Sequence, residues 1–470
     1  MLGRLRTGGV RRVAAAVLAM SMATTALGET LAETLSDAYV NSGAIEQNRA
    51  LLRAADEGVA QALAAMRPAL KWSGGINRNY GVSGVPDTAI ERTSTLTSSI
   101  ELSVQLVLYA GGQLRLGVDL AKESVLATRA TLLSAEQTLL LNATFSFLAI
   151  REATESLSLR QNNVRVIRQE VRAARDRFEV GEVTRTDVAL AEARLAAAVA
   201  ALAAAEGALI TAGEQFHRFV GRDPGQLVQP TRLPKIPGSV AEAKSQAVRR
   251  HPEIISAQHQ VAASELRILI AKGAMKPTVS VTGSYGLTES FNNRSFNQGG
   301  SVSLGASGPI YQGGELSSLV RQAMANRDAS RAQLHVVYLT IEQNVGQAYS
   351  DLRVAQANKT SFQEQVRAAR VAFQGVREEA ALGARTTLDV LDAEQELLDA
   401  RASLISAEIS EFQAAYSVLS AIGLMTPEAL QLAVPQFDPS QYYNMVRNAP
   451  VSQSKQGKEL DRVLRALGKD

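Results

Sequence analysis

Residues 180–188 read VGEVTRTDV, and residues 382–390 read LGARTTLDV, which places two related segments 202 positions apart. Two further pairs match at the same spacing: YAGGQ at 109–113 with YQGGE at 311–315, and FVG at 219–221 with AIG at 421–423. Three matches at one spacing indicate an internal repeat that extends over most of the chain. The sequence therefore predicts two copies of one design rather than three unrelated domains.

Each repeat is predicted to contain a helix, a β-hairpin, a very long helix, a turn and a second long helix, because proline-free stretches end at Pro or Gly. The first repeat, 29–221, is divided into helix 34–66, hairpin 69–109, helix 113–180, tip 181–187 and helix 188–221. The second repeat, 251–423, is divided into helix 252–273, hairpin 278–311, helix 315–382, tip 383–389 and helix 390–423.

The helix after each tip carries a heptad seam. In the first repeat, apolar residues follow 3-4 spacing from Val188 to Phe219, with Leu and Ala alternating; the second repeat shows the same pattern from Val390 to Ala421. Such spacing predicts antiparallel coiled-coil hairpins, in which the Ala side allows close approach of two helices. The long helices would each reach about 100 Å at ~1.5 Å per residue.

The hairpin segments have a different period. Val279, Val281, Tyr285 and Leu287 alternate with small or polar residues, as do Ile100 to Leu106 in the first repeat. Period-two runs of roughly ten residues are typical of transmembrane β-strands. Half-buried hairpins of a soluble protein are the alternative.

The number of strands bears on the number of copies. Four strands are too few for a closed barrel, so a membrane location requires several copies of the chain. Two, three or four copies would give eight, twelve or sixteen strands.

The N-terminus resembles a secretory signal. Residues 1–28 contain four Arg and no acidic residue, an apolar stretch and the small residues Ala26 and Gly28. This arrangement predicts a signal peptide that is removed, with a membrane anchor as the alternative. No later run is expected to supply the apolar length of a membrane helix. The rest of the chain has 45 basic and 46 acidic residues, which argues against nucleic acid as a partner.

Composition also limits the chemistry. The chain has no Cys, so disulfides, thiolate metal sites and a lipidated N-terminal Cys are excluded. Its four His residues are scattered, and no phosphate-binding, dinucleotide-binding, zinc-protease or serine-hydrolase motif occurs. We expect no catalytic site, no metal and no cofactor. The polar tail, 450–470, is expected to be disordered.

The duplicated layout, both tip motifs, LGARTTLDVLDAEQEL at 382–397 and the helix start His251-Pro252-Glu253 resemble the TolC family of outer-membrane export ducts. The resemblance implies a membrane α+β fold that assembles as a homotrimer. Its twelve strands would form one outer-membrane barrel, and its twelve helices a tunnel through the periplasm. A small mixed equatorial domain would come from 222–250 and 424–449.

The two tips are the candidate functional sites. Gly181 and Gly383 suit the left-handed position after a helix, and Thr184 and Thr386 begin T-x-x-D motifs that end at Asp187 and Asp389. Helix capping alone is therefore one explanation of both Asp residues. Capping does not require Asp392 or Arg385, which have Leu190 and Val183 as their repeat partners.

The resemblance implies that Asp389 and Asp392 form acidic rings at the tunnel constriction, and that Arg385 and Asp187 help to hold the tips closed. Family members can carry a gate tyrosine five positions before the arginine, whereas this chain has Ala380. How the closed state is held in this chain is thus an open question.

The resemblance also implies location in the outer membrane of a Gram-negative bacterium, a periplasmic adaptor, and an ABC or proton-driven inner-membrane pump as partners. The cargo would be secreted protein (type I secretion), which family resemblance slightly favours, or small molecules (efflux). A periplasmic coiled-coil adaptor without a pore is the alternative function. It would explain the signal peptide and the heptads but not the four amphipathic strands.

Overall fold

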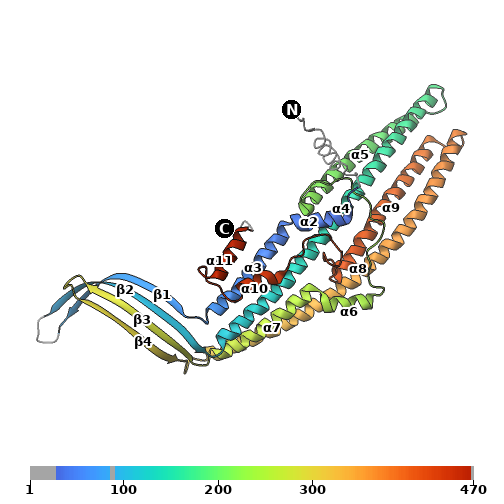
Figure 1. Ribbon diagram of the computed structural model, residues 1–470. Coiled ribbons are helices and arrows are strands. Elements are labelled where there is room, and N and C mark those ends of the chain that lie inside the picture. The colour runs from blue at the N-terminus through green and yellow to red at the C-terminus, as the bar shows by residue number, and fades with distance from the viewer. Residues whose placement is uncertain (1–27, 85–89, 467–470) are drawn as a thin grey trace, which may run out of the picture. The chain divides into compact units, whose positions relative to one another are not determined.

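The computed structural model describes residues 28–84 and 90–466 (Figure 1). The predicted signal peptide, 1–28, lies outside these residues except for Gly28. The described residues divide into two compact units. The first, which we call the tip unit, comprises 28–42, 136–240 and 346–434, and the second, the sheet unit, comprises 43–135 without 85–89, 241–345 and 435–466.

The sheet unit combines four strands with helices. The strands are β1 (Ala69–Ser83), β2 (Glu91–Ala110), β3 (Thr278–Ser290) and β4 (Phe296–Ser307). The helices are α3 (Gly43–Ala64), most of α6 (Val240–Arg250), α7 (Pro252–Gly273), α10 (Pro439–Val446), α11 (Lys455–Ala466) and the first parts of α4 (Gln113–Glu179) and α8 (Glu315–Ala381). The helices have a core of their own, in which Leu52 and Val59 of α3 pack with Val118, Val125 and Leu132 of α4.

The strands form one antiparallel sheet in the order β1-β2-β3-β4 (Figure 1). The pairing of β2 with β3 joins the two repeats, with Ile100 opposite Leu287 and Leu102 opposite Tyr285. Both β1 and β4 are edge strands within the described residues. An edge strand leaves a row of backbone N–H and C=O groups without partners, so this sheet is open on both sides.

One face of the sheet is apolar across all four strands. Directly paired residues share a face, so the register Leu70–Val104, Trp72–Leu102 and Val281–Leu304 places apolar side chains together. The opposite face carries polar and small residues. In the same register, Lys71 pairs with Ser103, and Thr282 pairs with Ser303. The predicted alternation of the strands is confirmed.

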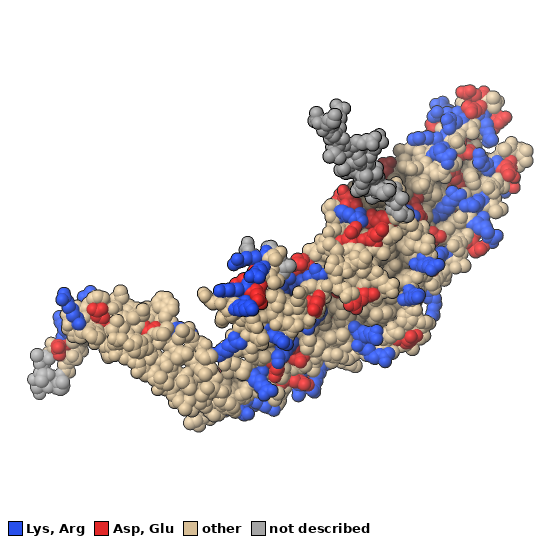
Figure 2. All heavy atoms as spheres, in the orientation of Figure 1, with Lys and Arg blue, Asp and Glu red and all other residues tan. Residues whose placement is uncertain are grey.

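The described part of the chain leaves the apolar face of the sheet uncovered. Trp72 is 77% exposed, Val302 84% and Leu304 70%. From Leu304 to Phe296, β4 advances by eight residue-to-residue steps, or about 27 Å at ~3.4 Å per step. On this face charged residues begin in the Phe296 row, where Glu289 pairs with Phe296, and continue in the next row, where Arg78 pairs with Leu96. Figure 2 shows few charged atoms over most of the sheet. A soluble hairpin would bury this face, so the half-buried alternative does not describe the chain.

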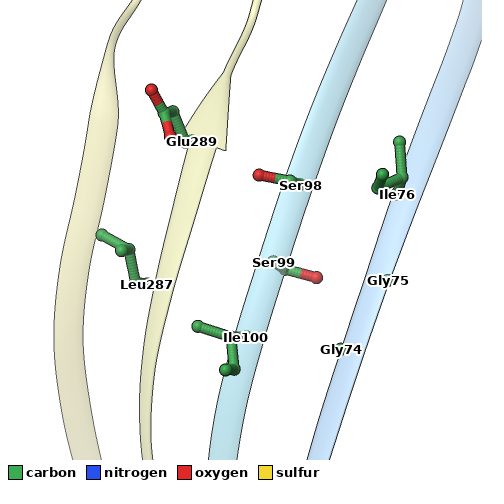
Figure 3. A pocket seen from close by; sticks show the side chains of 8 residues that line it. All are labelled: Gly74, Gly75, Ile76, Ser98, Ser99, Ile100, Leu287 and Glu289. Atoms are coloured by element: carbon green, nitrogen blue, oxygen red, sulfur yellow. The ribbon is translucent and has the colours of Figure 1, made fainter.

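A shallow hollow of about 600 Å³ lies on the sheet (Figure 3). Gly74 and Gly75 of β1 leave space there beside Ile76, Ile100 and Leu287. The hollow is a gap between side chains on the apolar face and contains a single charged residue, Glu289. It has no arrangement of polar groups that would bind a cofactor.

The tip unit consists of α2 (Leu31–Asn41), the later parts of α4 and α8, α5 (Arg185–Val220) and α9 (Thr387–Ala421). The predicted heptad seam forms its core. Ala191 and Ala198 of α5 are buried together with Val164, Ile167 and Val171 of α4, and Leu195 and Leu202 pack against this cluster. At ~1.5 Å per residue, the 67-residue helices α4 and α8 are each about 100 Å long.

Helix α5 corrects one expectation. It is long and apolar enough to cross a membrane by length and composition, although the sequence was expected to contain no such run after residue 28. The apolar character comes from its many Ala residues. One of its faces packs in the coiled-coil core, but only 11% of its apolar window is buried in the described chain.

Three further regions differ from expectation. The predicted helix 34–66 is two helices, α2 and α3, because Ser42 is extended and Asn41, Ser42 and Gly43 are weak helix formers. The tail predicted to be disordered contains α11, so that prediction is wrong for Lys455–Ala466. Helices α5 and α9 begin at Arg185 and Thr387, three residues before the predicted starts, since the capping residues sit at Thr184 and Thr386.

The segments expected to form an equatorial domain lie in both units. In the tip unit, Arg222 donates to Glu29 at 2.6 Å and to Asp37 at 2.8 Å, and Leu227 forms a parallel bridge with Glu29. In the sheet unit, α10 packs on α3, where Tyr442 donates to Glu57 at 2.7 Å. The parts of these segments are thus attached to α2 in the tip unit and to α3 in the sheet unit.

Candidate functional site

The first tip joins α4 to α5. Gly181 has φ +81°, the left-handed conformation predicted for a residue that ends a helix. Thr184 then caps α5: the Asp187 N–H donates to Thr184 Oγ1 at 3.3 Å, and the Thr184 N–H donates to Asp187 Oδ2 at 2.8 Å. The bond from the Thr184 N–H, and a second that the Thr184 hydroxyl donates to Asp187 Oδ2 at 2.8 Å, lower the pKa of Asp187. The T-x-x-D motif is therefore a complete capping box.

The second tip, between α8 and α9, has nearly the same geometry. Gly383 has φ +78°. The Asp389 N–H donates to Thr386 Oγ1 at 3.2 Å, and the Thr386 N–H donates to Asp389 Oδ2 at 2.9 Å. The backbone bond from Thr386 is the main cause that lowers the pKa of Asp389. The capping interpretation is confirmed at both tips, and the capping hydrogen bonds favour the ionised form of both Asp side chains, which are half-buried.

Arg385 does not contact Asp187 within the chain. Its Nε donates to Glu379 Oε2 at 2.9 Å, across the turn of the same helix hairpin. This hydrogen bond is the main reason why the pKa of Arg385 is raised. Ala380, at the position of the gate tyrosine, is buried and offers no hydrogen bond from its side chain.

Asp392 is paired with a residue that sequence reasoning missed. Arg194 of α5 donates to Asp392 Oδ1 of α9 at 2.7 Å, so the ion pair joins the two helix hairpins. The position that corresponds to Arg194 in the second repeat is Glu396, and the one that corresponds to Asp392 in the first is Leu190. A comparison of charges at repeat positions would have marked Arg194 as asymmetric, but the pairing itself depends on tertiary structure.

Glu394 is the second missed residue. It is only 6% exposed, accepts one hydrogen bond, from Asn163 of α4 at 3.4 Å, and its other oxygen is buried without a partner. Burial, and to a lesser extent the nearby Glu170, raises the pKa of Glu394 to about 7, although Arg377 and Arg401 oppose the shift. Glu394 lines a cavity of about 370 Å³ between α4, α8 and α9.

The repeat partner of Glu394 behaves differently. Glu192 is exposed and accepts from Arg175 of α4 at 2.5 Å, so it belongs to an ordinary surface ion pair. Among the described residues, no group of three or more His, Asp and Glu is arranged to hold a metal ion. The chemistry that this site offers is therefore electrostatic: acidic groups at the second tip, one ion pair between hairpins and one buried carboxyl group.

Comparisons with known proteins fit this geometry. The family model described as "Outer membrane efflux protein" matches residues 34–222 and 243–424. The outer membrane efflux protein BepC of Brucella suis biovar 1 (strain 1330) is 34% identical over 441 residues, which cover 93% of this chain and 95% of BepC. The outer membrane protein TolC of Escherichia coli (strain K12) is 26% identical over 312 residues, which cover 63% of each chain. The crystal structure of the Campylobacter jejuni CmeC outer membrane channel matches with a TM-score of 0.75, over 90% of both chains and at 16% identity, and so shares the fold.

Proposed function

The chain belongs to the outer membrane efflux protein family, and from this membership we propose that it is the outer-membrane duct of a three-part export system. It is an outer-membrane protein of a family of channels that extend into the periplasm. In the proposed system the duct is passive. An inner-membrane pump, ABC-type or proton-driven, supplies the energy, and a periplasmic adaptor connects the pump to the duct.

The observation that carries the proposal is the open, amphipathic sheet. Its exposed apolar face suits lipid, and its small and polar face suits a water-filled lumen. Lipid does not tolerate unpaired strand edges, so β1 of one copy must pair with β4 of another. Two copies would give a barrel of eight strands, and side chains nearly fill the interior of a barrel of that size. Three copies, with twelve strands, therefore give the smallest open duct.

The helices would continue the duct as a tunnel. Each chain supplies four long helical segments, so three copies would place twelve around one axis. The exposed apolar residues of α5, such as Val199 and Ile210, support lateral packing between copies, because a single chain leaves them in water.

We assign the gate to the tips. The carboxylates of Asp389 would form one acidic ring of the constriction and those of Asp392 a second, whose charge Arg194 partly offsets. Arg385 and Asp187 would hold the tips closed through contacts between copies, and Gly181, Thr184, Gly383 and Thr386 would shape the turns. Without a tyrosine at Ala380, the Arg194–Asp392 pair supports closure within each chain.

Small molecules are the first cargo class to test, because BepC, which aligns over most of this chain, is named an efflux protein. Secreted protein is the second. A deletion strain should become more sensitive to drugs, and complementation with the intact gene should reverse this. The same strain assayed for secreted proteins distinguishes the two cargo classes.

Fractionation distinguishes the duct from a periplasmic adaptor. The duct should appear in the outer membrane as a heat-modifiable oligomer that requires detergent. Soluble protein in the periplasm, together with unchanged drug sensitivity and unchanged protein secretion in the deletion strain, would contradict the proposal.

A further inference from the structure

Helix α11 has two dissimilar faces. Gly457 and Leu460 are buried against the protein, and Ser454 caps the helix by accepting from the Gly457 N–H at 3.0 Å. Gly457 is required there, because a Cβ atom would lie 2.1 Å from the carbonyl oxygen of Val451. The start of α11 is therefore fixed by contacts with the segment just before it, and the helix also contacts α10.

The opposite face of α11 is basic. Lys455, Lys458, Arg462 and Arg465 are separated by three, four and three positions, which places them in one stripe along the helix. All four side chains are exposed. Glu459 and Asp461 flank the stripe rather than interrupt it. Figure 2 shows Lys and Arg side chains grouped in this region, and the stripe has no partner on the described part of the chain.

Hydrogen bonds hold the segment before α11 close to the start of β1. Arg67 donates to the carbonyl oxygens of Asn448 at 2.5 Å and Ala449 at 2.8 Å. Arg67 is two residues before Ala69, where β1 begins, and Lys455 follows Ala449 by six positions. Six residues span at most about 20 Å, so α11 begins close to the end of the sheet from which the helices continue (Figure 1).

The same end of the sheet carries further positive charge. Lys272 lies in the last turn of α7, and Lys276 lies two residues before the start of β3; both side chains are exposed. A surface beside membrane strands that combines these residues with the stripe on α11 is complementary to an anionic headgroup layer.

We propose that the basic face of α11 binds anionic phospholipid headgroups on the periplasmic surface of the outer membrane. The proposal rests on the proposed function, because that function places the four strands in the membrane. Leu460 of α11 is buried, and the side chains that form the exposed stripe are all charged, so the proposed contact is mainly electrostatic. Such a contact should weaken as salt shortens the Debye length from ~10 Å at 0.1 M to ~3 Å at 1 M.

The absence of Cys from the chain allows a direct test. Ala466→Cys, at the exposed end of α11, is labelled with a fluorophore in the full-length protein and reconstituted into vesicles that contain headgroup spin-labelled lipid. We expect severalfold stronger quenching in phosphatidylethanolamine–phosphatidylglycerol vesicles than in phosphatidylcholine vesicles, and loss of the difference at high salt. Reversal of all four charges (K455E, K458E, R462E and R465E) should abolish the difference in quenching between the two kinds of vesicle. The charge-conserving K455R, K458R, R462K and R465K should retain this difference.

Channel conductance in the same vesicles distinguishes failure of the proposed duct from failure of the proposed lipid contact of α11. Normal conductance with equal quenching in both lipids would overturn the inference and leave the duct intact. Conductance that is absent because the strands do not insert would overturn the duct and the inference with it. Because the comparison between lipids uses the labelled protein without charge reversal, it is decisive even if the reversed variant fails to fold.

Discussion

The two helix tips have the same backbone and different surroundings. Gly181 and Gly383 take the same left-handed conformation, and Thr184 and Thr386 form the same capping box. Past the turn the repeats diverge. Glu192 lies in a surface ion pair, whereas its partner Glu394 is buried with one oxygen unsatisfied.

This comparison separates what builds a tip from what distinguishes it. The turn itself is set by local hydrogen bonds and is duplicated with the sequence. The differences concern charge and burial. Asp392 and Arg385 are present in the second tip only, Glu394 is buried whereas Glu192 is not, and Arg194 of the first hairpin pairs with Asp392. We therefore expect loss of the capping Thr to act equally on both tips, and substitutions of the charged residues of the second tip to act on gating.

The largest effect should come from the acidic rings. Asp389→Asn combined with Asp392→Asn removes six carboxylates from a trimer while keeping side-chain size. We expect the concentration of a trivalent cation that half-blocks conductance from the periplasmic side to rise about tenfold, because a focused negative potential is lost. Planar-bilayer recordings measure this.

The control for this pair is Glu396→Gln with Asp399→Asn, which removes as many charges from the same helix. Its block should remain close to wild type. Unchanged block in the Asp389 and Asp392 variant would show that these residues do not line the constriction.

The next effect concerns pH. Because folding raises the pKa of Glu394 to about 7, the folded state holds a proton that the unfolded state loses near its ordinary value of 4.5. The stabilisation is fully present below 4.5 and is lost as pH rises through 7. Glu394→Gln keeps the neutral form, so it should raise the Tm at pH 8 and leave it unchanged at pH 4.5.

Glu192→Gln is the matched control, since Glu192 is the repeat partner and is exposed. It should have a small effect that does not change between pH 4.5 and 8. A pH-independent effect of Glu394→Gln would mean that Glu394 is ionised throughout, and the contrast between the tips would disappear.

Loss of a capping box should affect both tips alike. Thr184→Ala and Thr386→Ala each remove an N-cap, which typically costs about 1 kcal/mol of stability. Chemical denaturation of the two variants measures the loss. A loss of stability in only one of the two variants would show that the two capping boxes contribute different free energies despite their shared geometry.

The smallest effect concerns closure. Arg194→Ala removes the ion pair between hairpins, and an exposed pair of this kind contributes about 0.5 kcal/mol, or roughly a twofold shift per copy toward the open state. Single-channel recordings should show a higher open probability. Arg175→Ala breaks an ion pair within one hairpin and should leave opening unchanged, whereas equal effects of the two variants would exclude Arg194 from closure.

Local patterns predicted most of the secondary structure. The heptad seam with Ala191 and Ala198 located α5, and T-x-x-D identified both capping boxes, because helix period and capping are set by neighbours in sequence; the predicted helix starts were still three residues late. The alternation of the strands predicted one apolar face, and the register confirms it. Membership of the TolC-like family, inferred from the tip motifs, is confirmed by the comparisons.

Long-range pairing could not be predicted in the same way. The contact of Arg194 with Asp392 joins residues almost 200 positions apart, and the burial of Glu394 depends on Asn163 of another helix. Helix α11 was missed because its charged composition is typical of disorder, whereas its stability comes from tertiary contacts of Leu460 and the cap at Ser454. The asymmetry of the tips thus resides mainly in contacts that no local pattern encodes.

The central claim is that neighbouring copies close the open sheet. Leu70→Cys on β1, combined in turn with Leu304→Cys and Ala306→Cys on β4, places thiols on the two edge strands of a chain that otherwise has none. After oxidation in the outer membrane, at least one pair should link β1 of one copy to β4 of the next and give a covalent ring of three chains. A monomer without such links, or links only within a chain, would contradict the account.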